Sequence, residues 1–333
     1  MTAPADPHDT LVPRVEVVGP LDMDEVAAVA ALVEEATEAD GVRPLSEHVM
    51  LHLRYGGDQD VRNVLVWLGG RLAAYGHLDV TDEVAGASSE LVVGPAHRRS
   101  GLGTRLVQAT LAETTDGRLR LWAHGEHPAA ASMAASMGFR RSRSLWQMRR
   151  SLFSALPTPA LPEGVQVRTF RPGLDDDAWV TLNALAFRDH PEQGTWNAED
   201  LHRRMREPWF DPEGFFLAWR GDRLVGFHWT KVHGHAAHGH EAHGHEPIGE
   251  VYVVGVDPAE QGTGLGRALT LTGLRHLRHL GLPEAMLYVD ADNAGAIRLY
   301  THLGFTRWET DVMFSRDGDG APREEPSDRG APG

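Results

Sequence analysis

Apolar and polar residues alternate along this chain in two series of short segments that follow the same order. Each series opens on a stretch with the period of two that is typical of a strand, Arg14–Val18 in the first half and Val165–Phe170 in the second. Apolar positions three and four residues apart then predict a first helix in each half, over residues 21–37 and 175–187. The two halves therefore begin alike.

Short turns interrupt the next apolar stretches and predict a hairpin in each half. Gly69-Gly70 separates two strand-like runs in the first half, and Gly221-Asp222 separates two in the second. The paired runs are residues 63–68 with 71–80 and residues 214–220 with 223–232. A hairpin at the same place in both halves extends the similarity between them.

Two further landmarks recur downstream at nearly one spacing. An apolar run meets a proline and is followed by a Gly-x-Gly turn, whose first glycines, Gly101 and Gly264, stand 163 residues apart. A Gly-Phe pair follows at Gly138 and Gly304, which are 166 residues apart. This repetition indicates duplication. Each half reads strand, helix, helix, three strands, helix, strand, helix, strand, which predicts an α/β fold (α+β type, mixed sheet) in two tandem domains.

A proline-rich stretch marks the boundary between the halves. Residues 154–164 hold three prolines and end on a glycine, a composition that favours extended backbone over helix. We expect an N-terminal domain over residues 1–153, a linker over 154–164 and a C-terminal domain over 165–316. The tail, residues 317–333, is rich in Gly, Pro, Asp and Arg, and we expect it to be disordered.

Composition narrows the classes of function. The 333 residues carry a formal net charge of −15, which disfavours nonspecific binding to nucleic acid and suits a cationic or neutral small-molecule substrate. The absence of cysteine excludes disulfides, thiolate metal ligands and a cysteine nucleophile. Neither a signal peptide nor an apolar run long enough to span a membrane is found in the sequence. We expect a soluble, cytoplasmic and monomeric protein.

The second Gly-x-Gly turn, Gln261–Gly266, lies between a strand and a helix. Glycine lets the backbone turn tightly with its N–H groups outward, and the helix N-terminus adds a partial positive charge, so the turn suits a pyrophosphate. A plain turn that needs positive φ is the simpler alternative. A dinucleotide site fits less well, because its fingerprint has a third glycine and normally follows the first strand, whereas this turn follows the fourth.

The pattern Gln/Arg-x-x-Gly-x-Gly after an apolar strand resembles that of the GCN5-related N-acetyltransferases. The residues that carry it are Arg98, Gly101 and Gly103 in the first half and Gln261, Gly264 and Gly266 in the second. The later segment Asn293–Phe305 is similar to the family's closing motif. The resemblance covers residues 15–150 and 165–315, and it implies that acetyl-CoA lies beside the fourth strand with its pyrophosphate on the glycine turn.

The resemblance also implies a set of residues around acetyl-CoA in each half. In the second half these are Val254, Gly255, Val256, Gln261, Gly262, Thr263, Gly264, Leu265, Gly266, Arg267, Asn293, Ala294, Gly295, Ala296, Ile297 and Arg298. In the first half they are Leu91, Val92, Val93, Arg99, Ser100, Gly101, Leu102, Gly103 and Thr104. Backbone groups of Val254 and Val256 are expected to pair with the pantetheine arm. We expect no metal, because acetyl transfer needs none.

Acetyl transfer to an amine needs a base for the ammonium proton, a donor for the oxyanion and an acid for the departing thiolate. Glu250 opens the fourth strand of the second half, where a carboxylate can accept the proton through water. Tyr300 stands four residues before Gly304, and the resemblance implies that it protonates the sulfur. A backbone N–H near Val254 is the expected oxyanion donor. A solvated glutamate and a tyrosine packed in the core are the structural alternatives.

The first half lacks this acid–base pair. An alignment on the prolines puts Ala87 in the place of Glu250, and an alignment on the Gly-Phe pairs puts Ala134 in the place of Tyr300. We therefore expect the first half to be catalytically silent, either as a domain that binds acetyl-CoA or as a scaffold.

Several segments outside the cofactor motif resemble the mycothiol synthases, a group of tandem acetyltransferases. They are His190–Gly194, Trp209–Pro212, Gly226–His233, Gly249–Pro258 and Leu287–Asn293. The resemblance implies acetylation of the cysteinyl amine of a cysteine–glucosamine–inositol conjugate, the final step of mycothiol biosynthesis. Another small amine, such as an aminoglycoside or a polyamine, is the alternative substrate. A non-catalytic acyl-CoA sensor is a third interpretation. A sensor needs neither a general base nor a general acid, so Glu250 and Tyr300 together argue against it.

Charged and hydroxyl side chains suit that ligand. Glu192 and Glu250 suit the cationic amine. Lys231, Tyr288 and Glu47 suit the sugar and inositol hydroxyls. Each of these residues also has a structural alternative. Glu192 can be a turn residue, Lys231 a solvated strand end, Tyr288 a core residue and Glu47 a helix cap.

One stretch departs from the resemblance. Residues 233–245 hold six histidines diluted by glycine and alanine. Such a stretch can bind a divalent transition metal, but its low complexity favours a plain loop.

Overall fold

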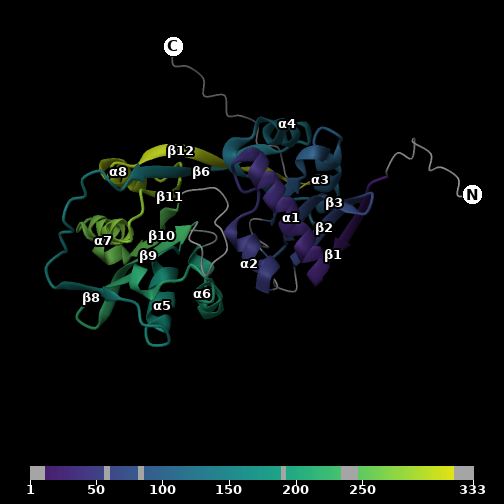
Figure 1. The fold of residues 1–333 in the computed structure, drawn as a ribbon. Helices are drawn as coiled ribbons and strands as arrows, with labels where there is room; N and C mark the ends of the chain where they lie inside the picture. Colours follow the sequence, from purple (N-terminus) through teal and green to yellow (C-terminus); the bar gives the residue numbers. More distant parts are fainter. Residues whose placement is uncertain (1–11, 56–60, 82–85, 189–192, 234–246, 319–333) are drawn as a thin grey trace, which may run out of the picture. The chain divides into compact units, whose positions relative to one another are not determined.

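The computed structural model describes residues 12–55, 61–81, 86–188, 193–233 and 247–318, and these form two compact units. The first unit joins residues 1–144 to residues 310–333, and the second consists of residues 145–309. Figure 1 shows the elements in sequence colours. The tail expected to be disordered falls largely outside the described residues. No helix in the described ranges is long and apolar enough to cross a membrane.

The first unit follows the predicted order of elements. It contains β1 (Arg14–Val18), α1 (Met23–Asp40), α2 (Glu47–Tyr55), β2 (Val61–Leu68), β3 (Arg71–Asp79), β4 (Ala87–Val93), α3 (Leu102–Ala112), β5 (Leu119–Ala123), α4 (Pro128–Ser136) and the first residues of β6 (Arg140–Ser151). Its sheet runs β1-β2-β3-β4-β5 and is completed by the end of β12 (Thr306–Arg316). Strands β4 and β5 are parallel, and the other pairs in this sheet are antiparallel.

Alternation along β2 decides which helix covers which face of this sheet. Leu65 packs in one core cluster with residues of α1 and α2, whereas Val64 and Val66 pack in another with Leu106 of α3. Because successive side chains of a strand point to opposite faces, α1 and α2 cover one face and α3 covers the other.

The second unit repeats this plan. It contains β7 (Val165–Thr169), α5 (Asp176–Ala186), α6 (Ala198–Met205), β8 (Phe215–Arg220), β9 (Arg223–His233), β10 (Ile248–Val256), α7 (Leu265–His279), β11 (Glu284–Asp290) and α8 (Ala294–His302). Its sheet runs β7-β8-β9-β10-β11 and is completed by the end of β6. The α/β fold with a mixed sheet in each of two tandem domains is thus confirmed.

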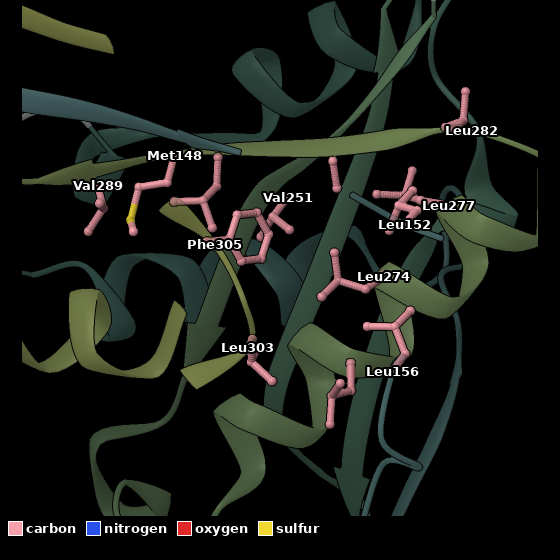
Figure 2. Close-up of a cluster of buried hydrophobic side chains, with 13 residues drawn as sticks. Met148, Leu152, Leu156, Val251, Leu274, Leu277, Leu282, Val289, Leu303 and Phe305 are labelled. Atoms are coloured by element: carbon pink, nitrogen blue, oxygen red, sulfur yellow. The ribbon is translucent and has the colours of Figure 1, made fainter. Parts of the chain in front are cut away.

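Helices again cover both faces of the second sheet. Leu217 of β8 packs with Trp179 of α5 and with α6, whereas its neighbour Ala218 packs with Leu265 and Leu269 of α7. Figure 2 shows the cluster on the α7 side, in which Val251, Leu274 and Phe305 are buried beside Met148 of β6. This packing on both faces of the sheet fixes β10, whose first residues form the candidate site.

The last strand of each sheet comes from the other half of the sequence. Residues 145–151 of β6 pair with β11, and residues 312–316 of β12 pair with β5. The division into units therefore differs from the expected domain boundary at residues 153 and 165. The proline-rich stretch has neither helix nor strand, and its Leu156 is buried in the core of the second unit (Figure 2). A strand pattern predicts that a strand forms, but not which sheet edge it joins.

Candidate active site

The turn after β10 has the geometry of an anion cradle. Gly264 caps the N-terminus of α7 in the left-handed conformation (φ 89°), and Gly262 is also left-handed (φ 80°). A Cβ atom built on either glycine meets no protein atom within 4 Å, so the turn is open on that side. The first N–H groups of a helix have no partner within it, and the helix dipole makes them attractive to anions.

Strand β10 parts from β11 directly after Glu250. The two strands share only two registered pairs, Gly249 with Ala285 and Glu250 with Met286, although β10 stays paired with β9 to Val256. The backbone of β10 beyond Glu250 is therefore not paired with β11. An extended amide ligand can take the place of the missing strand there, as peptides do at a sheet edge. The residues expected to meet the pantetheine arm, Val254 and Val256, lie in this stretch.

The second helix terminus expected to meet acetyl-CoA is that of α8. Asn293 caps it, and its side-chain oxygen accepts a hydrogen bond from Ala296 N at 3.0 Å. Residues 293–295 and Arg298 are exposed. Arg267 of α7 is exposed as well, so each of these two helices carries an arginine that is accessible to solvent.

Glu250 is a buried carboxylate rather than a solvated strand end. Its side chain is 8% exposed, and its Oε2 lies 2.6 Å from Nε2 of His233 on β9. It stands directly opposite Lys231 in the antiparallel pair of β10 and β9. Burial alone raises the pKa of Glu250, but the hydrogen bond and charge of His233 and the charge of Lys231 outweigh it and lower the pKa. Glu250 is therefore ionised and ready to accept a proton.

The ammonium of Lys231 lies over two aromatic rings that the sequence analysis did not predict as its neighbours. Its Nζ is 4.5 Å from the ring centroid of Trp209 and 5.3 Å from that of Tyr252, which are cation–π distances. Arg204 of α6 donates a hydrogen bond to the Tyr252 hydroxyl at 2.8 Å. The ammonium of Lys231 is thus held beside Glu250, and the alternative of a solvated lysine is wrong, since Lys231 is buried.

The other expected substrate residues divide into three cases. Tyr288 of β11 is 42% exposed and accepts a hydrogen bond from Gln147 Nε2 at 2.9 Å, so it is not a core residue. Glu192 lies outside the described residues. Glu47 begins α2 in the first unit and is half-buried.

Tyr300 packs at the edge of the core of the second unit. Its ring meets Phe305 edge-on at 5.9 Å between centroids, and the residue is half-buried. Burial raises the pKa of Tyr300 to about 12, so its hydroxyl keeps its proton at neutral pH and can donate it. The hydroxyl is thus in the protonated form that a general acid must have, and its raised pKa makes it a weaker acid than an ordinary tyrosine.

Comparison with known proteins decides the family. The model of the acetyltransferase (GNAT) family matches residues 28–139 and residues 179–305, one region in each half. This chain belongs to that family. The acetyltransferase is 62% identical over 312 residues to a mycothiol acetyltransferase of Acidothermus cellulolyticus. The aligned region covers 92% of this chain and 95% of the relative. It is 58% identical to a mycothiol acetyltransferase of Streptosporangium roseum, over 91% of this chain and 99% of the relative.

A solved structure shares the fold. A tandem GNAT protein from the clavulanic acid biosynthesis pathway matches 93% of this acetyltransferase and 100% of its own chain, with a TM-score of 0.70 and 19% identity. Members of the family use acetyl-CoA as co-substrate, and the open glycine turn and the parted β10 edge fit its pyrophosphate and its pantetheine arm. The protein is therefore an acetyl-CoA-dependent acetyltransferase. The histidine-rich stretch from residue 234 on lies outside the described residues, and among those described no cluster of His, Asp or Glu can hold a metal ion.

The first unit of the acetyltransferase keeps the turn but not the carboxylate. Gly101 caps α3 with φ 85°, as Gly264 caps α7. Ser88 pairs with Asp79 on β3 and with Arg120 on β5, the register that Glu250 has in the second unit. The sequence alignment gave Ala87 at this place, which is wrong by one residue because β10 carries an extra residue.

The extra residue in β10 is Tyr252, and it is where the register with β9 shifts. Val251 pairs with Thr230 and Val253 with Trp229, so the register between the two strands shifts by one residue at Tyr252. Strand β4 pairs with β3 without such a shift. Ala134 occupies the same position in α4 that Tyr300 has in α8, the seventh of nine residues.

The first unit also differs at its glycine turn. A Cβ atom built on Gly103 lies 3.0 Å from the sulfur of Met133, whereas one built on Gly266 meets only Val256 at 3.6 Å. Met133 of α4 therefore narrows the space around the first turn.

A Tyr300→Phe variant tests the acid. Without the hydroxyl, water must protonate the departing thiolate, so we expect kcat to fall about 10-fold, which is a smaller loss than removal of the base causes. The ring stays, and the packing on Phe305 with it, so the thermal midpoint should not change. Steady-state release of CoA, separated from the thiol-bearing substrate by chromatography, measures the effect. A variant with the full wild-type kcat would exclude this role.

Proposed function

We propose that this acetyltransferase moves the acetyl group of acetyl-CoA to the cysteinyl amine of a cysteine–glucosamine–inositol conjugate, the final step of mycothiol biosynthesis. The observation that carries the proposal is the identity of 62% to a protein named mycothiol acetyltransferase across nearly the whole of both chains. That identity extends over both units, and so well beyond the glycine turn.

The site residues suit this reaction in the following way. Glu250 removes a proton from the substrate ammonium through water, and the freed amine attacks the acetyl carbon. The N–H of Val254 stabilises the oxyanion, the carbon–sulfur bond breaks, and Tyr300 protonates the thiolate. The support for these roles is the burial and ionisation of Glu250, the protonated hydroxyl of Tyr300, and the β10 edge that lies open next to Val254.

For the substrate, we propose that Lys231 and Tyr288 bind hydroxyl groups and that Glu250 also holds the amine. Register places Lys231 and Glu250 side by side, and Tyr288 is two residues beyond Met286, which pairs with Glu250. In a strand, residues two apart share a face, so all three side chains lie on the same face of the sheet. Glu192 and Glu47 remain predicted contacts.

We further propose that the first unit does not turn over substrate. Ser88 and Ala134 stand where the second unit has Glu250 and Tyr300, and neither can act as a base or an acid at neutral pH. The turn from Arg99 to Thr104 retains the glycine geometry for acetyl-CoA. A cytoplasmic location, a monomeric state and the absence of nucleic-acid and membrane partners also remain predictions.

A panel of amines tests the proposed function. The enzyme is incubated with acetyl-CoA and, in separate reactions, the cysteinyl conjugate, an aminoglycoside and a polyamine, and release of CoA is followed. We expect kcat/KM for the conjugate to exceed that for the other amines by about 10²-fold or more, because a polyamine lacks the hydroxyl groups that the site pairs with and an aminoglycoside presents its hydroxyl groups on a different ring framework. Release with the aminoglycoside or the polyamine alone would overturn the proposed substrate. Binding of acetyl-CoA without release for any amine would favour a sensor.

A further inference from the structure

The carboxylate of Glu250 has one close partner that the sequence assigned to a loop. His233, the last residue of β9, places Nε2 2.6 Å from Glu250 Oε2. The register pairs Glu250 with Lys231, so His233 is its diagonal neighbour on the same face of the sheet. The two side chains differ in exposure, 35% for His233 against 8% for Glu250. His233 therefore connects a buried carboxylate to solvent.

The surroundings of Glu250 leave few other routes for a proton. The ionisable groups that act on it within the described residues are His233 and Lys231, both on β9. On the other side, β11 places the apolar side chain of Met286 beside it. On β10 itself the next side chain on its face is Tyr252, whose hydroxyl accepts the hydrogen bond from Arg204. Lys231, as an ammonium, has no lone pair to take a proton.

The chemistry of the reaction makes this connection useful. An α-ammonium group ordinarily titrates at a pH of about 7.7–8.0 and a carboxylic acid at about 4, so a carboxylate with a lowered pKa holds the transferred proton only briefly. An imidazole ordinarily titrates at about 6.5, much closer to the amine. Proton transfer is efficient when the pKa of the acceptor lies near that of the donor and near the working pH.

We propose that His233 and Glu250 act together as the base, with His233 taking up the amine proton that reaches Glu250 and passing it to solvent. The imidazole enters this step neutral, with its hydrogen on Nδ1 and a lone pair on Nε2. One N–H bond of the ammonium breaks, its electron pair stays on the amine nitrogen, and one N–H bond forms at Nε2 of the imidazole. The pair then consists of an imidazolium and a carboxylate, which attract each other. The inference rests on the proposed function, since it requires the amine to be bound next to Glu250.

The chain offers a matched control for this pair. His202 of α6 places Nε2 2.8 Å from Oδ2 of Asp176, and its side chain is 50% exposed. It is thus another half-exposed histidine paired with a carboxylate in the second unit, but it makes no contact with Glu250. A His202→Gln variant should keep wild-type kinetics.

The experiment compares His233→Gln, His233→Ala and His202→Gln by kcat/KM for the amine between pH 5.5 and 9. We expect both His233 variants to lose about 10- to 100-fold at pH 7. We also expect the acid limb of the pH profile of kcat/KM to shift in pH relative to that of the wild type in both variants. The KM for acetyl-CoA should be unchanged. Added imidazole should restore activity to His233→Ala in proportion to its neutral form, and it should not restore Glu250→Gln.

Two results would overturn the inference. One is a wild-type rate and pH profile in His233→Gln. The other is an equal loss at every pH that imidazole does not relieve, which marks a purely structural role. Thermal midpoints of all variants show whether each is folded. If the wild type does not acetylate the conjugate but acetylates another amine, the proposed substrate fails, and the role of His233 can still be measured on that amine.

Discussion

Replacing Glu250 by glutamine lowers kcat/KM for the amine about 10²-fold or more at neutral pH, the usual size of the loss when a general base is removed. Glutamine has nearly the same shape but no basic oxygen, so it cannot take the proton of the ammonium. Because the open turn at Gly262 and Gly264, where we propose that acetyl-CoA binds, is unchanged, the KM for acetyl-CoA should stay the same. The measurement is the initial rate of CoA release at saturating acetyl-CoA.

An exposed glutamate on the neighbouring strand gives the control. Glu284 begins β11, and Glu284→Gln should have no effect on the rate. A loss of less than about tenfold in Glu250→Gln would contradict its role as the base. The pKa of Glu250 lies below the ordinary value of 4.5, so Glu250 stays ionised throughout the neutral range. A fall in rate between pH 7 and 6 therefore does not report on Glu250.

The second large effect concerns stability and lies in the first unit. The side chain of His124, after β5, is 14% exposed and lies between two carboxylates: Nε2 is 3.4 Å from Glu90 Oε2 and Nδ1 is 3.1 Å from Asp311 Oδ2. Glu90 also accepts a hydrogen bond from Ser46 N at 2.5 Å, and Asp311 accepts one from Gly125 N at 2.9 Å. The network joins β4, the start of α2 and β12, and it holds the backbone next to Glu47.

We expect His124→Ala to lower the free energy of unfolding by about 3–5 kcal/mol, because removal of one partner leaves buried charge without compensation. His202→Gln, which breaks a half-exposed pair, should change it by at most about 1 kcal/mol. Denaturant unfolding of the full chain measures both. A loss below about 1 kcal/mol in His124→Ala would show that the network is not charged in the folded protein.

The dependence of this stability on pH has a defined sign. Burial lowers the pKa of His124, but hydrogen bonds and charge from Asp311 and Glu90 outweigh it and raise the pKa from 6.5 to about 10. The stabilisation from His124 is thus complete below pH 6.5 and disappears as the pH rises towards 10. Burial raises the pKa of Glu90, but its partners, His124 first, lower it from 4.5 to about 2. That contribution is complete above pH 4.5 and is lost as the pH falls towards 2.

The difference between wild type and His124→Ala in thermal midpoint should therefore be largest between about pH 4.5 and 6.5 and should shrink above that window. A difference that grows from pH 7 to pH 9 would contradict these pKa directions.

Local chemistry made much of the fold predictable. Gly101 and Gly264 stand at turns that need a left-handed residue, and both have the expected conformation. The hairpins lie at Gly69-Gly70 and Gly221-Asp222, as expected. The partners of β6 and β12 were not predictable, because strand pairing depends on contacts distant in sequence. The sequence alignment paired Glu250 with Ala87 instead of Ser88 for a related reason. The extra residue at Tyr252 is recognised only from the register of the paired strands.

The site was predictable where a motif carried it and not elsewhere. Glu250 and Tyr300 stand at motif positions, and their roles remain predictions until they are tested. His233 was overlooked because it opens a histidine-rich stretch whose composition indicates a loop, although the strand pattern of β9 continues through it. Trp209 and Tyr252 are separated from Lys231 in sequence, and only the folded sheet brings their rings over its ammonium.

The structure of the product tests the central claim most directly. The enzyme is incubated with acetyl-CoA and the cysteinyl conjugate, and the product is isolated and characterised by mass and by NMR. We expect the mass of the conjugate to increase by one acetyl group, with the acetyl on the cysteinyl nitrogen and the thiol still free to react. An acetyl group on sulfur or on a sugar oxygen, or a conjugate recovered unchanged while acetyl-CoA is consumed with another amine, would contradict it.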